Sequence, residues 1–216
     1  MKKLALPILM LLSLVACKKE TPVFTFVLTN QQVKVKNLSN DYLVQVNNAE
    51  KTVYIEVAYA DKAELNALNV EIAGLPADVT ANPASFTFNF SSGAAQSVTF
   101  TQGELQEIYK ITAAASKPDP HFVSVKLNGI DVAGGTAKLK GSADLTKVAV
   151  EFVVSPENTV VKIGDEVITS YTEESPNAID FSDKMNGVKF SLVCDDVTKE
   201  ETIKVVTTGI NRVNRV

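Results

Sequence analysis

Few side chains in this sequence have the chemistry that catalysis or metal binding requires. His121 is the only histidine, and Cys17 and Cys194 are the only two cysteines. A zinc site or a Cys–His pair needs several such groups close together, and His121 follows Pro120 in a proline-rich stretch where a solvated side chain is expected. The sequence contains no glycine-rich phosphate loop and no nucleophile elbow. We therefore expect no enzyme activity, no metal centre and no cofactor.

Carboxylates gather between residues 165 and 183. Two carboxylates can hydrolyse a glycoside, and a cluster of oxygen ligands can bind calcium. The acidic residues of this stretch are Asp165, Glu166, Glu173, Glu174, Asp180 and Asp183. Because their spacing lacks the Asp-x-Asp-x-Asp-Gly pattern of a calcium loop, we expect a solvated acidic surface, with calcium binding as the alternative.

Aromatic side chains are the remaining candidates for contact with a ligand. The chain has five tyrosines and no tryptophan. Tyr54 alternates with the apolar residues of a predicted strand and is therefore expected to point away from the core, and Tyr171 falls in a predicted loop. The sequence thus gives a weak candidate binding site at Tyr54, Tyr171, Glu173 and Glu174.

The amino terminus has the plan of an export signal. Lys2 and Lys3 precede about a dozen mostly apolar residues, whereas a membrane-spanning helix needs roughly 20. No later segment approaches that length, so we expect no spanning helix in the mature chain. Residues 1–16 are predicted to be a cleaved signal peptide.

The four residues Leu14-Val15-Ala16-Cys17 resemble the lipobox of bacterial lipoproteins. The resemblance implies cleavage before Cys17, a diacylglycerol on its sulfur and a further acyl chain such as palmitate on its new amine. Each buried methylene contributes about 0.8 kcal/mol and one chain alone anchors only marginally, so three chains give a durable anchor. Residues 17–22 then form a short tether, with the first strand expected near Val23.

The mature chain is acidic, which argues against a nucleic-acid partner. Loss of Lys2 and Lys3 with the signal lowers the basic residues from 21 to 19, against 25 acidic residues, a net charge of −6. Nucleic acid requires clustered Lys and Arg, and Arg212 and Arg215 in the tail 211–216 are too few. The expected partners are the membrane, through the lipid on Cys17, and a protein or a glycan.

Apolar and polar residues alternate along most of the remaining chain, most clearly at 53–57, 86–90, 148–154 and 188–194. Such runs, separated by Gly, Asn, Pro and Ser, predict half-buried antiparallel strands and an all-β fold, with a short helical turn only at 61–69. Cys194 shares the apolar face of the last run and has no disulfide partner once Cys17 is lipidated. It is expected to be a buried core thiol.

The sequence also repeats itself. Residues 63–72 match 143–152, 89–91 match 180–182, 98–100 match 188–190 and 109–111 match 203–205, all in the same order, and 42–47 resemble 122–127 more loosely. Each copy has about 90 residues, the size of an immunoglobulin-like sandwich. We therefore predict two tandem immunoglobulin-like β-sandwich domains, at residues 23–116 and 121–210, joined by the proline-rich linker 117–120. The alternative is one larger sandwich.

The second copy is longer than the first in one place. The offset between the copies grows by about eleven residues between Phe152 and Asp180, which places an insertion within residues 155–178. Extra length falls in loops, and loops are where binding residues concentrate.

With this lipobox and this repeat, the chain resembles small, uncharacterised lipoproteins of Gram-negative gut commensals that carry tandem immunoglobulin-like domains. The resemblance implies a lipid anchor in the outer membrane. Lys18-Lys19-Glu20 resembles a weak form of the acidic tract that directs such proteins to the cell surface, which favours the outer over the periplasmic face. The expected function is a non-enzymatic binding, scaffold or spacer module for a protein partner. The alternative is a glycan-binding accessory lipoprotein of a polysaccharide-uptake system, since many of these proteins are encoded beside such systems.

Overall fold

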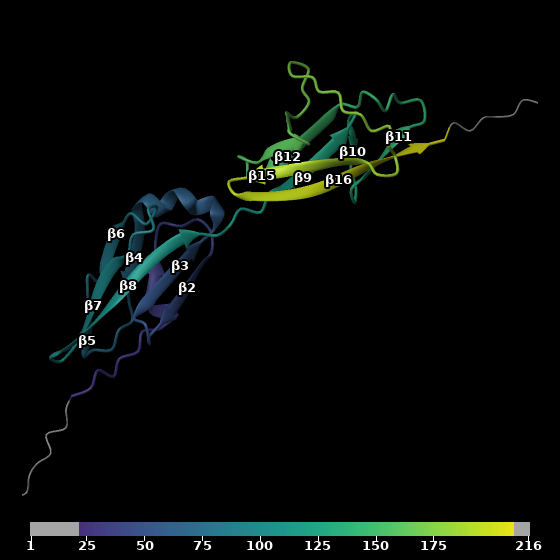
Figure 1. Cartoon of the computed structure of the whole chain (residues 1–216). Coiled ribbons are helices and arrows are strands. Elements are labelled where there is room, and N and C mark those ends of the chain that lie inside the picture. The colour runs from purple at the N-terminus through teal and green to yellow at the C-terminus, as the bar shows by residue number, and fades with distance from the viewer. Residues whose placement is uncertain (1–21, 210–216) are drawn as a thin grey trace, which may run out of the picture.

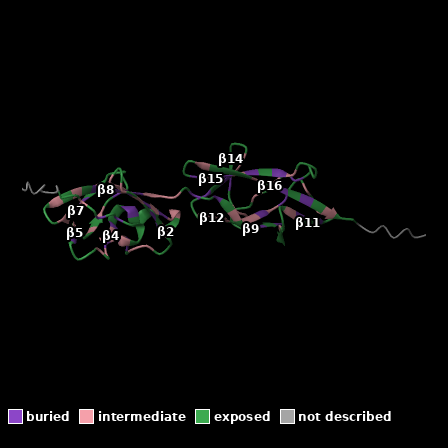
Figure 2. Ribbon diagram, turned by 90° about the horizontal axis from the view of Figure 1, so that it is seen from below, coloured by how far each residue is buried: buried purple, intermediate pink, exposed green. Residues whose placement is uncertain are grey.

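The chain folds into two β-rich domains that follow one another along the sequence (Figure 1). A computed structural model describes residues 22–209, so the predicted signal, Cys17 and the tail 211–216 lie outside the described residues. Each domain has its own hydrophobic core, and no buried residue is shared between the two cores (Figure 2). The predicted all-β fold of two tandem sandwiches is confirmed. Within residues 22–209 no helix is long and apolar enough to cross a membrane.

The first domain packs a three-stranded sheet against a five-stranded sheet. In spatial order the first sheet contains β1 (Val33–Val35), β4 (Leu68–Ile72) and β6 (Ser85–Phe88). The second sheet contains β2 (Tyr42–Asn47), β3 (Thr52–Val57), β8 (Leu105–Ala115), β7 (Gln96–Gln102) and β5 (Val79–Asn82). Two 3-10 helices, η1 (Asn30–Gln32) and η2 (Tyr59–Ala67), complete the domain. The position of η2 agrees with the helical turn predicted at 61–69.

The second domain has the same two-sheet plan. Its three-stranded sheet contains β10 (Ile130–Asp131), β9 (His121–Leu127) and β12 (Val150–Ser155). Its five-stranded sheet contains β11 (Thr136–Lys140), β16 (Val197–Thr208), β15 (Val188–Cys194), β13 (Val160–Ile163) and β14 (Glu166–Ile168).

The two domains share their central strand pairings, which agrees with the predicted repeat, and differ in their edge strands. The first repeated block contains β4 in one domain and the start of β12 in the other, and each of these strands pairs antiparallel with an earlier strand, β1 or β9. In each domain another early strand, β3 or β11, runs parallel to the last strand, β8 or β16. Phe90 and Phe181, which the sequence match equates, are both buried, and each donates its backbone N–H over 2.7 Å to Leu65 and Leu145 respectively. The shared topology identifies both domains as immunoglobulin-like sandwiches.

Two finer expectations are wrong. The loose match of 42–47 with 122–127 does not equate strands, because β2 pairs with β3 in a five-stranded sheet whereas β9 pairs with β12 in a three-stranded sheet. No strand lies near Val23: residues 22–29 form none, and β1 is the first. Side-chain amides replace a neighbouring strand there. The N–H of Phe26 donates to Gln102 Oε1 (3.2 Å) and that of Leu28 to Asn48 Oδ1 (3.0 Å).

The insertion predicted at 155–178 covers a sheet edge. In the first domain β6 pairs along β4, but no strand takes that place beside β12. Instead Asn177 accepts the N–H of Val150 and donates to its carbonyl oxygen, both at 2.8 Å, and the N–H of Phe152 donates to Ser170 Oγ at 2.7 Å. An uncovered edge strand can pair with the strands of other chains. This loop covers the edge of β12, as β6 covers the edge of β4 in the first domain.

Replacing Asn177 with alanine should therefore destabilise the second domain. The change leaves the N–H of buried Val150 without its partner, which costs about 1–3 kcal/mol, whereas the Val150 carbonyl keeps the backbone N–H of Tyr171. Urea unfolding followed by circular dichroism measures this loss. Glu173→Ala, an exposed change in the same loop, is the control and should shift the free energy of unfolding by less than about 0.5 kcal/mol. Equal changes in the free energy of unfolding for Asn177→Ala and Glu173→Ala would contradict the role of Asn177 in covering the edge of β12.

Candidate functional site

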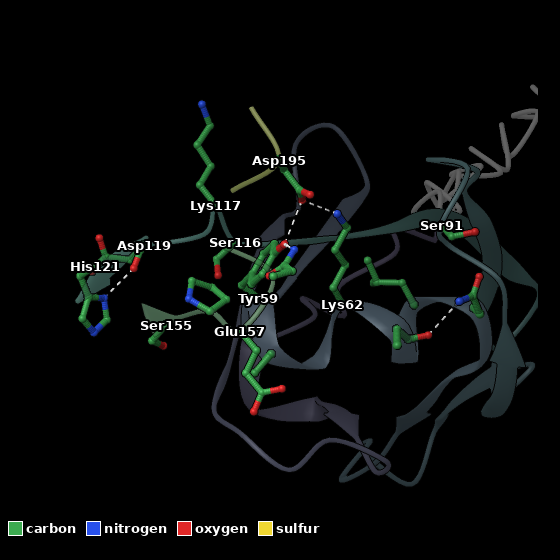
Figure 3. A pocket seen from close by; sticks show the side chains of 16 residues that line it. Tyr59, Lys62, Ser91, Ser116, Lys117, Asp119, His121, Ser155, Glu157 and Asp195 are labelled. Carbon is green, nitrogen blue, oxygen red and sulfur yellow. Dashed lines mark hydrogen bonds and ion pairs between the residues drawn. The ribbon is translucent and has the colours of Figure 1, made fainter. Parts of the chain in front are cut away.

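A groove of about 1050 Å³ lies where the two domains meet (Figure 3). On the first domain, η2 supplies Tyr59 and Lys62. The second domain supplies residues 155–158, at and just after the end of β12, and Asp195, in the turn between β15 and β16. The connection at 116–121 contributes the remaining side. The groove therefore exists only because the domains are held together.

The hydroxyl of Tyr59 joins the domains. It donates to Asp195 Oδ2 (3.1 Å), accepts from Asn158 Nδ2 (3.0 Å) and lies 3.3 Å from Cys194 Sγ. The thiol of Cys194 also lies 3.4 Å from Asn158 Oδ1, to which it can donate. With Lys62 these residues form what we call the junction cluster. Its polar groups satisfy one another, which is the condition under which a polar network rigidifies a contact.

Lys62 adds charge to the junction cluster. Its ammonium lies 2.6 Å from Asp195 Oδ2 and 5.4 Å from the centre of the Tyr59 ring. Exposed ion pairs of this kind contribute little alone, but this one acts on an oxygen that Tyr59 also uses. The hydrogen bond from Lys62, and then that from Tyr59, lowers the pKa of Asp195, while Asp195 raises the pKa of Lys62. The hydrogen bond with Cys194 is the first cause of a raised pKa at Tyr59.

Cys194 is a buried thiol, as the sequence predicts, and its sulfur also has polar neighbours. Its side chain is 0% exposed, yet it lies outside the hydrophobic cluster of the second domain. Its sulfur faces Tyr59 and Asn158 instead. The apolar alternation of β15 identified the buried face correctly, and it could not show that Tyr59 of the other domain contacts the sulfur.

Asp195 occupies a position that the first domain gives to glycine. Both hairpins between the last two strands have two-residue turns, which begin with Gly103 at φ 61° and with Asp195 at φ 48°. Left-handed backbone is uncommon for residues other than glycine, although aspartate tolerates it better than most. Here the carboxylate reaches Tyr59 and Lys62. The replacement of glycine by aspartate between the two matched turns is the sequence signal that could have located the junction cluster.

The connection between the domains is attached at both ends. The N–H of Ser116 donates to Val57 in the first domain (2.8 Å), and Asp119 pairs with Lys199 of β16 in the second. Pro118 and Pro120 are buried. His121, expected to be a solvated linker residue, is exposed at the start of β9, and its Nδ1–H donates to the Asp119 carbonyl over 2.7 Å.

The candidate residues chosen from sequence lie away from the groove. Tyr54 is half-buried on β3 in a shallow depression of about 460 Å³ with Gln45 and Thr52. Tyr171 is half-buried in the inserted loop, where its backbone N–H donates to Val150 (2.8 Å), and Glu173 and Glu174 of the same loop are exposed. Tyr54 is thus in one domain and the other three are in the other. Among residues 22–209 no group of three or more His, Cys, Asp or Glu side chains could hold a metal ion.

No protein-family model and no curated protein matches this sequence. Among solved structures, extracellular domains 3–5 of Drosophila OTK are similar at 11% identity and a TM-score of 0.23, over 83% of this chain and 63% of that chain. The present chain thus spans less than two thirds of that chain. A likeness at this level carries no functional argument, and the class assigned here, a two-domain immunoglobulin-like β-sandwich protein, rests on the strand topology.

Replacing Lys62 with methionine should raise the pKa of Asp195, because it removes the first cause of the lowered value. A carboxylate with a lowered pKa stabilises the contact above its unfolded pKa, and that contribution is lost as the pH falls through the folded value. In Lys62→Met the loss should therefore begin at higher pH. A carboxyl-carbon NMR titration measures the pKa of Asp195 in the parent protein and in Lys62→Met. Asp183, whose pKa is lowered first by the backbone N–H of Asn186, is the internal control, and an unchanged Asp195 value would contradict the assignment.

Proposed function

We propose that this protein is a lipoprotein anchored to the outer membrane through Cys17, with the cell surface favoured over the periplasmic face. In this proposal it acts as a non-enzymatic binding, scaffold or spacer module for a protein partner. The lipobox resemblance supports the anchor. The observation that carries the proposal is the junction cluster, which joins two sandwiches into one module with a groove that spans both.

The order of the domains suits a module that projects from a membrane. In Figure 1 the domains lie in line, and residues 22–26 and the end of β16 are at opposite ends of the described chain. Phe26 is the first buried residue after Cys17 among those described. Because nine extended residues span at most roughly 30 Å, a lipid on Cys17 would keep the first domain close to the bilayer and hold the second beyond it.

The composition of the groove favours a protein partner. Ala60, Ala63 and Pro156 line it together with the charged Lys117 and Glu157, for which residues 22–209 provide no ion-pair partner. Apolar surface bordered by polar and charged side chains is the usual composition of a protein interface.

The proposal is tested by site-specific photo-crosslinking in the cells that make the protein. A photoreactive amino acid in place of the exposed Asn66, which lines the groove, should give a discrete protein adduct. The same amino acid at Val206, exposed on β16 at the far end of the second domain, is the matched control and should give none. Equal adducts from both positions, or none from Asn66, would count against a partner in the groove.

The anchor is tested in the same cells. Cys17→Ser should move the protein from the membrane fraction to the soluble fraction and remove the lipid mass from its amino terminus. Retention of the variant in the membrane fraction would contradict anchoring through Cys17.

Glycan binding is the second candidate function, and the depression at Tyr54 favours it. Gln45 lies opposite Tyr54 on β2, and Thr52 precedes it on β3. Within residues 22–209 the side chains of all three form no hydrogen bond, which leaves an amide and two hydroxyls beside an aromatic ring for a sugar. Tyr171 is less suitable, because its loop covers the edge of β12.

A glycan array with the Cys17→Ser protein tests this second candidate. Binding should be lost in Tyr54→Ala and kept in Tyr171→Ala. If the parent protein binds no glycan, or if only Tyr171→Ala loses binding, the site at Tyr54 is excluded.

A further inference from the structure

We propose that the domain junction is a hinge. In this proposal the two domains separate reversibly when the junction cluster breaks, and separation exposes the thiol of Cys194 to solvent. The inference stands apart from the identity of any partner, because it concerns only contacts within the chain.

The residues whose hydrogen bonds link the two domains lie outside both cores. The hydrogen bonds that cross the contact between the domains join Tyr59 and Lys62 to Asn158, Cys194 and Asp195. Both hydrophobic cores are complete without it, since each draws its buried residues from one domain alone. Polar interfaces between domains permit relative motion, so the junction can open while both sandwiches stay folded.

The pivot can be placed within the connection. Ser116 is hydrogen-bonded to Val57 in the first domain, and Asp119 forms a salt bridge with Lys199 in the second. Lys117 and Pro118 are the residues between these attachments. Proline fixes its own φ and restricts the residue before it, which limits the swing to a hinge rather than a free linker.

Cys194 lies against a residue of the other domain. Its strand neighbours Phe190 and Leu192 belong to the core of the second domain, whereas Cys194, at the end of β15 beside the turn, does not. The groups that face its sulfur are the hydroxyl of Tyr59 and the amide of Asn158. Asn158 stays beside the thiol when the hinge opens, but Tyr59 leaves with the first domain, so opening is expected to raise the accessibility of this thiol.

The hinge also sets the width of the groove, since its walls lie on different domains. A ligand that touches both walls binds the closed state better than the open state and shifts the population accordingly. The junction cluster therefore couples occupancy of the groove to the accessibility of Cys194.

The experiment measures the rate at which Cys194 reacts with a small thiol reagent. In Cys17→Ser protein Cys194 is the only thiol, so the signal comes from one site. The reaction should proceed through local opening, with a rate almost independent of urea well below the unfolding transition. Tyr59→Phe keeps the ring and removes the hydroxyl, and should raise the labelling rate about tenfold with an unchanged unfolding midpoint, as expected when about 1.4 kcal/mol of hydrogen bonding is lost.

Tyr54→Phe is the matched control, because it removes a tyrosine hydroxyl from the same domain but outside the junction. Its labelling rate should equal that of the parent. The hinge proposal is contradicted if Cys194 reacts as slowly in Tyr59→Phe as in the parent protein. It is also contradicted if the reaction rate in both proteins has the urea dependence of global unfolding. Neither the lipid nor a partner enters this measurement, so a failed hinge and a failed binding proposal are distinguishable.

Discussion

The hydroxyl of Tyr59 is the contact on which the arrangement of the two domains depends. One oxygen serves the carboxylate of Asp195, the amide of Asn158 and the thiol of Cys194. Removing it breaks all three contacts at once: Asn158 Nδ2 loses its partner, while Asp195 keeps Lys62 and Cys194 keeps Asn158 Oδ1. A contact of a few side chains can therefore align two domains whose cores do not touch, and the groove exists only while it holds.

The repeat explains where this contact is found. The two copies agree where the fold requires it, as in the buried Phe90 and Phe181 with their equivalent backbone hydrogen bonds. They differ at the junction, where Cys194 and Asp195 stand in place of Gln102 and Gly103 before and within matching turns. In the first domain Gln102 instead receives the N–H groups of Thr25 and Phe26, close to the predicted tether. Equivalent hairpins thus attach each domain to the segment that precedes it.

The sequence predicted the fold because alternation is a local signal and the repeat is visible when two stretches of the chain are compared directly. The strands, the helical turn at η2 and the burial of Cys194 follow from residues a few positions apart, and the two copies follow from matched blocks. The junction did not follow, because Tyr59 and Cys194 are 135 residues apart and alternation shows which face is buried, not what buries it. The role of the insertion was missed for a similar reason. Asn177 and Ser170 take the place of a strand with isolated side-chain hydrogen bonds, and isolated side chains leave no period in the sequence.

The junction cluster is expected to give the two domains one predominant relative orientation. Residual dipolar couplings of backbone N–H groups, measured in weakly aligned Cys17→Ser protein, test it most directly. Couplings from residues 30–115 and from residues 121–208 should fit the structure with one common alignment tensor. Two tensors that differ in magnitude and direction would show that the domains reorient independently, and would contradict the account.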